Sequence, residues 1–139
     1  MRDLHNNISV VAAITPEVLD ADKESSALDL QGYEAAELAI HVGVGGITFS
    51  GTNKVEFVLT HSDDDSTYSE VEASDVEGVD SVTDGIIHSL TAEHAAGNII
   101  TLGYIGGKRY LKLKADFSGT HGTGTPMSAV LVKGRPHQA

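Results

Sequence analysis

The chain has 139 residues and no cysteine, which excludes disulfides, thiol catalysis and thiolate zinc sites. Its size predicts a single domain, residues 1–139, with one hydrophobic core. Twenty acidic against nine basic residues give a net charge of −11, so the chain repels phosphate backbones and we expect no nucleic-acid partner. Residues 1–99 hold nineteen acids and three bases, whereas residues 100–139 hold one acid and six bases. The basic C-terminal third could dock on an acidic surface or neutralise acidic strands of its own domain.

The N-terminal segment has neither the pattern of a secretion signal nor that of a membrane anchor. The apolar run Ile8–Ile14 is short and follows the charged residue Asp3. No stretch approaches the roughly 20 apolar residues that span a bilayer, so we expect no membrane partner. We expect a protein made in a cytoplasm, with a partly extended arm over about residues 1–25. Within it, Pro16–Ala21 could form one helical turn.

Alternating polar and apolar residues separated by glycine-rich and aspartate-rich turns predict a protein made of strands. The strand candidates, in chain order, are Ile8–Ile14, Glu37–Val42, Lys54–Leu59, Ile86–Leu90, Ile99–Ile105, Arg109–Lys114 and Met127–Lys133. Only Thr91–Gly97, with a capping threonine and a terminal glycine, predicts a short helix. About seven to nine short strands at this spacing predict an all-β fold, an antiparallel β-sandwich or jelly roll.

Three aspartates, Asp63–Asp65, stand between two apolar stretches. An EF-hand loop counted from Asp63 requires glycine at its sixth position and an acid at its twelfth, and the chain has Tyr68 and Ser74 there. A weak cation site remains possible in principle. A hairpin connection stabilised by side chain to backbone hydrogen bonds is the favoured interpretation.

Other catalytic and cofactor motifs are absent from the sequence. Gly43–Gly46 lacks the helix that follows a dinucleotide fingerprint, and Gly106–Lys108 lacks the first glycine and the Ser or Thr of a phosphate loop. No G-x-S-x-G elbow is present. The seven histidines show no metal-ligand spacing; they are His5, His41, His61, His88, His94, His121 and His137. We therefore predict no enzyme activity, no cofactor and no metal.

Five segments together resemble a known family. They are RDLHNNISVV, QGYEAAELAI, VEFVLTHSDDDSTYSEV, LGYIGGKRYLKLK and SAVLVKGRP. In this ordered pattern, which runs over most of the chain, the sequence resembles the head decoration (cement) proteins of tailed bacteriophages. The resemblance implies a β-rich virion structural protein that binds the major capsid protein on the outer surface of the head and stabilises it, commonly as a homotrimer.

The resemblance also indicates where shell contacts should lie. They are expected in the N-terminal segment and in the basic strand, at Arg2, Asp3, Leu4, Asn6, Ile8, Lys108, Arg109, Lys112 and Lys114. An alternative is a fibre-like virion accessory module that binds glycans on the host surface. The absence of tryptophan counts against this alternative, because ring stacking is a main source of affinity for sugars.

Overall fold

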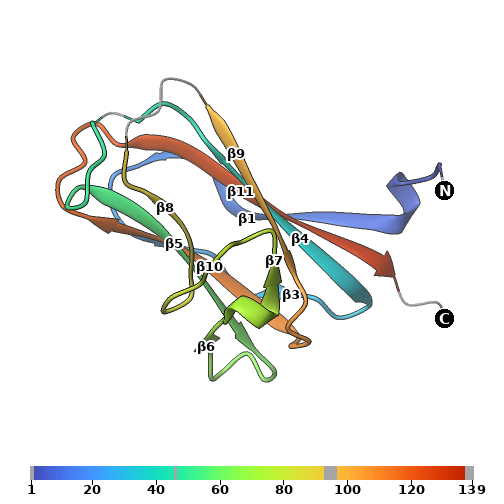
Figure 1. Cartoon of the computed structure of the whole chain (residues 1–139). Helices are drawn as coiled ribbons and strands as arrows, with labels where there is room; N and C mark the ends of the chain where they lie inside the picture. Colours follow the sequence, from blue (N-terminus) through green and yellow to red (C-terminus); the bar gives the residue numbers. More distant parts are fainter. Residues whose placement is uncertain (1, 46, 93–96, 137–139) are drawn as a thin grey trace.

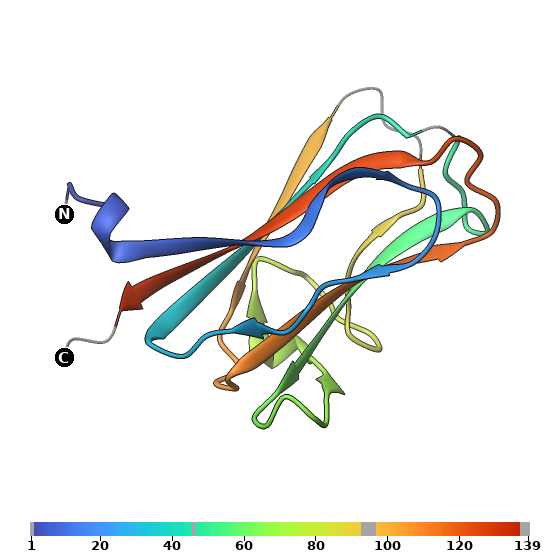
Figure 2. The same ribbon diagram turned by 180° about the vertical axis from the view of Figure 1, so that it is seen from behind.

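The computed structural model describes residues 2–45, 47–92 and 97–136 and consists of two antiparallel β-sheets packed against each other (Figures 1 and 2). The predicted all-β sandwich is therefore confirmed. In chain order the elements are η1 (His5–Asn7), β1 (Ile8–Leu19), β2 (Lys23–Glu24), β3 (Leu28–Asp29), β4 (Tyr33–Val42), β5 (Lys54–Ser62), β6 (Ser69–Glu70), η2 (Ala73–Asp75), β7 (Val76–Glu77), β8 (Ile86–Leu90), β9 (Asn98–Tyr104), β10 (Tyr110–Ser118) and β11 (Thr125–Pro136). In the described part of the chain, no helix is long and apolar enough to cross a bilayer.

Each sheet is built around long strands from distant parts of the chain. The first sheet, sheet A, has the order β1-β11-β4-β9-β7. The second, sheet B, has β10 and β5 at its centre, with β2 and β3 beside β10 and with β6 and β8 beside β5. Both sheets therefore join the two ends of the sequence to its middle.

The core lies between the sheets and is supplied by alternate residues of each strand. Ile40 and Leu131 of sheet A and Phe57 and Leu113 of sheet B are fully buried. Because successive side chains of a strand point to opposite faces, a single alternating pattern suffices to build each half of this core. Each such side chain contributes about 1.5–3 kcal/mol relative to an exposed position.

The seven longer strands coincide with the seven predicted ones, although several extend beyond the predicted ends. The four two-residue strands were not predicted, because two residues are too few to show a period. The helix predicted at Thr91–Gly97 falls mostly on residues 93–96, which lie outside the described residues.

The helical turn predicted at Pro16–Ala21 is wrong, because β1 continues through Pro16 as far as Leu19. Proline is tolerated there because β1 is the edge strand of sheet A, where an amide N–H can face away from the ladder without loss. The register with β11 shifts between Ala12 and Ile14 and again between Ile14 and Glu17. These irregularities let the strand follow the sandwich around its edge.

The predicted arm of residues 1–25 divides into two parts. Ala13, Ile14 and Leu19 are buried in the core, so the second part belongs to the sandwich. The first part, η1 and the start of β1, projects beyond the body beside the end of β11, and both chain ends lie there (Figures 1 and 2). We call residues 2–10 together with residues 132–136 the ribbon.

Candidate interaction surface at the ribbon end

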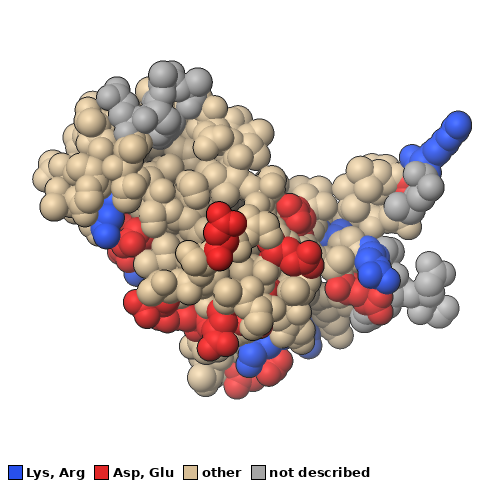
Figure 3. All heavy atoms as spheres, in the orientation of Figure 1, with Lys and Arg blue, Asp and Glu red and all other residues tan. Residues whose placement is uncertain are grey.

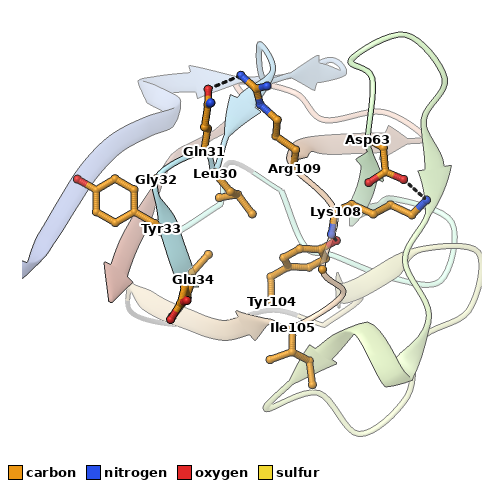
Figure 4. Close-up of a pocket in the computed structure, with 13 residues that line it drawn as sticks. Leu30, Gln31, Gly32, Tyr33, Glu34, Asp63, Tyr104, Ile105, Lys108 and Arg109 are labelled. Atoms are coloured by element: carbon orange, nitrogen blue, oxygen red, sulfur yellow. Dashed lines mark hydrogen bonds and ion pairs between the residues drawn. The ribbon is translucent and has the colours of Figure 1, made fainter. Parts of the chain in front are cut away.

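A cleft of about 760 Å³ opens between the two sheets at the end from which the ribbon projects (Figure 4). Its walls come from the turn before β4, the first residues of β4, and the loop between β9 and β10. Leu30, Ala36 and Tyr104 give it apolar surface, and Asp63 and Lys108 lie on one side of it. The cleft therefore combines apolar surface with charged groups.

Beneath the cleft, a chain of hydrogen bonds connects β5, β9 and η2. The Lys108 backbone N–H donates to Tyr104 Oη at 3.1 Å, and Tyr104 Oη lies 2.8 Å from His61 Nδ1. The Tyr104 hydroxyl donates or accepts in this second bond according to the tautomer of His61, and the other ring nitrogen of His61, Nε2, faces Asp75. That nitrogen is 4.0 Å from Asp75 Oδ2.

The titration properties of this chain favour a structural role. Burial raises the pKa of Tyr104 to about 12. Burial lowers the pKa of His61, partly opposed by the charge of Asp75. Both groups are therefore held in their neutral forms near pH 7, and the tyrosine is not activated as a nucleophile.

The basic residues at the mouth of the cleft are engaged within the molecule. Arg109 donates two hydrogen bonds of 2.9 Å to the Asp29 carboxylate and one of 2.7 Å to Gln31 Oε1 (Figure 4). The Arg109 hydrogen bond lowers the pKa of Asp29 to about 2. Lys108 Nζ lies 3.4 Å from Asp63. These two ion pairs therefore connect residues that are 80 and 45 positions apart in the sequence.

The other two predicted contact lysines lie elsewhere. Lys112 and Lys114 are on the outer face of sheet B, opposite Thr60 and Val58 of β5. Lys112 Nζ sits 4.6 Å from the centre of the Tyr68 ring. Lys114 Nζ is 3.6 Å from an Asp22 oxygen. The structure therefore brings Lys108 and Arg109 to the ribbon end and separates Lys112 and Lys114 from them.

The predicted contact residues of the N-terminal segment all lie on the ribbon. Arg2, Asp3, Leu4 and Asn6 belong to its tip, residues 2–7, and Ile8 lies at the base of the tip, where β1 begins. Asp3 accepts hydrogen bonds from the backbone N–H and side-chain amide of Asn6, which lower the pKa of Asp3. Leu4 is 59 % exposed. Ile8 pairs with Gly134 of β11. The tip thus has local order from its own hydrogen bonds and little burial.

Two arginines at this end differ from every other Lys or Arg in the chain. Within the described residues, all six lysines and Arg109 contact a carboxylate, a carbonyl oxygen or an aromatic ring. Arg2 and Arg135 have no such partner among those residues, and both belong to the ribbon. Figure 3 shows basic side chains on the projecting part, where acidic ones also lie, and side chains of both charges on the body. The free positive charge is therefore concentrated on the ribbon.

The sequence reasoning did not identify the outer face of sheet A. Val10 pairs with Val132, and Ala12 pairs with Val130, which in turn pairs with Ala39 of β4. These side chains face away from the core, and Val10 is 54 % exposed. The available signal was that the segments VVAAI and AVLV are apolar at every position, which is typical of strands covered on both faces.

The aspartate cluster forms the turn between β5 and β6. The Asp64 carboxylate accepts hydrogen bonds from the backbone N–H groups of Ser66 and Thr67, each at 3.0 Å, and from the Ser62 hydroxyl at 2.8 Å. These bonds lower the pKa of Asp64 to about 2. The described residues contain no group of three or more His, Asp or Glu placed to hold a metal ion.

Comparisons with known proteins give structural likeness only. No family model matches the chain, and no curated protein matches it in sequence. The fold is similar to that of the SPBc2 prophage-derived protein YomS, with a TM-score of 0.45 and 11 % identity, over 91 % of this chain and 93 % of that one. It is also similar to a protein of Bacillus endospore appendages, which are described as disulfide-linked pili, with a TM-score of 0.44 and 11 % identity, over 94 % and 90 % of the two chains.

Proposed function

We propose that this protein is a structural component of a tailed-phage virion that binds the outer surface of the assembled head and stabilises it, as a homotrimer and without enzymatic activity. The observation that carries the proposal is the ribbon end, where exposed apolar residues project from the sandwich together with two arginines that have no partner among the described residues. The resemblance of five ordered sequence segments to head decoration proteins supports the same assignment.

The geometry suits a contact that is spread over a surface. A cement protein must touch several subunits of a shell at once, and a projecting two-stranded ribbon can lie along such a surface or pair with a neighbouring sheet. Many copies act together on one particle, so modest affinity per copy is sufficient to retain them.

The test is binding to purified heads that lack this protein. We expect the wild type to saturate the heads, and a variant lacking residues 2–7 to show an apparent affinity lower by about tenfold or more, because the exposed tip is lost from every copy. Circular dichroism and thermal melting should remain those of the wild type, since η1 contains no buried residue. Full occupancy by the truncated chain would remove the ribbon tip from the interface.

The predicted contribution of Lys112 and Lys114 needs its own variant, because they lie on a different face. The double variant Lys112→Glu/Lys114→Glu should lower head occupancy if the outer face of sheet B meets the shell. A matched control is Glu77→Lys, which changes the charge of an exposed acid on β7 of the other sheet. Unchanged occupancy of the double variant would exclude that face and leave the ribbon end as the contact.

A further inference from the structure

A second groove, of about 610 Å³, lies on the side of the sandwich opposite to β1. It is bounded by β8 of sheet B, by β9 of sheet A and by the loop of residues 78–85 that connects β7 to β8. Ile86, Ile87 and Ile100 give it an apolar floor. No Lys or Arg lines it, and its charged residues are Glu56 and Asp80.

The two strands that flank this groove present edges without a strand partner. Among the described residues, β8 pairs with β5, and Ile86 also forms an isolated bridge with Thr83 of the preceding loop, which leaves the edge without a partner at residues 87–90. Ile100 and Thr101 of β9 pair only with β4, because β7 reaches no further than Gly103 and Tyr104. Edge strands carry backbone N–H and C=O groups that another extended chain can bind. The groove is therefore shaped for an extended peptide segment.

The charge of the groove restricts which segment it accepts. Glu56 is already paired with Lys54 at 3.5 Å. Asp80 is exposed and has no hydrogen bond or ion pair with any described residue. In the sequence, no Lys or Arg occurs between Lys54 and Lys108, so the loops around the groove are uniformly acidic. A favourable occupant carries positive charge together with apolar side chains.

The ribbon tip of another copy of this chain has these properties. Among the described residues Arg2 has no partner, and Leu4 is 59 % exposed. In an extended segment Arg2 and Leu4 share one face, and Asp3, which lies between them, points to the other. η1 has no buried residue, so straightening it to enter the groove breaks the local hydrogen bonds that Asp3 and Leu4 accept from Asn6 and Asn7 but uncovers no part of the core. The tip also projects away from its own body, on the far side of sheet A from the groove (Figures 1 and 2).

We propose that the acidic groove between β8 and β9 binds the N-terminal ribbon tip of a second copy, with Leu4 on the apolar floor and Arg2 beside Asp80. The contact joins two different surfaces of the protein, so the arrangement of copies is head-to-tail. If the rotation that relates one copy to the next closes after a whole number of copies, the assembly is a ring. This inference rests on the proposed function, because copies bound side by side on the head place the ribbon of one within reach of the next. Its test, however, uses the isolated protein.

The first experiment measures self-association of the full chain by analytical ultracentrifugation. We expect concentration-dependent association that weakens from about 50 to about 500 mM salt, because exposed charges are screened. Arg2→Asp and Asp80→Arg should each raise the dissociation constant by about three- to tenfold, since each places like charges together. An equimolar mixture of the two variants should associate better than either alone, because the reversed tip then meets the reversed groove.

Glu70→Lys serves as the control, because it changes an exposed acid outside the groove and should leave association unchanged. Association that resists both reversals, or a mixture no better than its components, would overturn the pairing of Arg2 with Asp80. A chain that stays monomeric at all concentrations would overturn the whole inference. Neither result bears on whether the monomer binds heads, so failure here is distinct from failure of the proposed function.

The second experiment locates the contact directly. Since the chain has no cysteine, single introduced thiols are unique. A short bis-maleimide should join Leu4→Cys to Ser81→Cys when the two variants are mixed, because Ser81 lines the groove. Leu4→Cys mixed with Ser66→Cys, in the distant β5–β6 turn, should give no joined product above background. Equal yields in both mixtures would show that the tip does not select the groove.

Discussion

At the scale of single residues, the most informative feature is the hydrogen-bonded chain of Lys108 N–H, Tyr104 and His61. It connects the two sheets beneath the cleft through contacts of 3.1 and 2.8 Å. His61 is buried and Tyr104 is 6 % exposed. Removing one partner from such a chain leaves the others desolvated and unbonded, which costs more than the bond contributes when present.

Tyr104→Phe is therefore expected to lower the free energy of unfolding by about 1–3 kcal/mol, measured by urea denaturation. It removes the acceptor of the Lys108 N–H and the hydroxyl partner of His61 Nδ1. Tyr68→Phe is the matched control, because the Tyr68 hydroxyl bonds the exposed Asp65 carboxylate and its loss should change stability by less than about 0.5 kcal/mol. Equal effects of the two substitutions would contradict the structural role of the buried chain.

Histidine burial also predicts a pH dependence. The pKa of His61 and that of His88 are lowered by burial from 6.5, so the unfolded chain binds protons to these rings before the folded protein does. The free energy of unfolding should therefore fall as the pH drops below about 6.5. The low pKa of Asp29, about 2, acts in a separate window, because its contribution is lost only as the pH falls from about 3.8 toward 2.

We expect the free energy of unfolding to be lower at about pH 5.5 than at about pH 7.5. The difference should be smaller in His61→Gln, which has no ring to protonate. An Asp29→Asn variant should retain the wild-type difference across this range, since the Asp29 carboxyl does not titrate there. A stability that rises on acidification to pH 5.5 would show that the histidines are not desolvated.

At the scale of elements, β11 shows how one strand serves two surfaces. Leu131 is fully buried between the sheets, whereas its neighbour Val132 faces outward beside Val10 of β1. Apolar residues therefore occupy both faces of β11, but only one face contributes to the core of the isolated molecule. The outward face is available for contact with another surface, as the proposed function requires.

Truncation at adjacent positions tests this assignment. Leu131→Ala should reduce the free energy of unfolding by about 2–5 kcal/mol, because it opens a cavity in a closed core. Val132→Ala, on the outer face of the same strand, should cost less than about 1 kcal/mol. Chemical denaturation of both variants measures the difference. Similar losses would place Val132 in a second packed layer.

At the scale of the whole molecule, positive and negative charges are separated. Every acid and base near the cleft is matched by a partner, whereas the free arginines lie on the ribbon and unpaired acids such as Asp80 lie by the second groove. A molecule with this distribution can bind in one orientation, because the opposite orientation brings like charges together.

Imaging of assembled particles should therefore show this protein at hundreds of sites on the head, with the ribbon end toward the shell or a neighbouring copy. The proposed avidity depends on such a copy number. A handful of copies at the tail would instead favour the alternative adhesion module. A uniform spread of orientations on the head would contradict the charge argument.

The sequence by itself determined the all-β class, the seven long strands and the aspartate turn. These features depend on residues within a few positions of one another: alternation at period two defines strands such as β5, and the Asp64 carboxylate accepts hydrogen bonds from its own turn. Arg109–Lys114 was likewise recognisable as a strand, together with the face that its lysines share.

Only the tertiary structure decided which of these local features meet. The pairing of Arg109 with Asp29, the burial of His61 against Tyr104 and the groove between β8 and β9 join residues far apart in the chain. Strand order cannot be read from alternation, because any two amphipathic strands satisfy the same period. The course of β1 through Pro16 was decided in the same way, since the edge of a sheet tolerates a residue that its centre excludes.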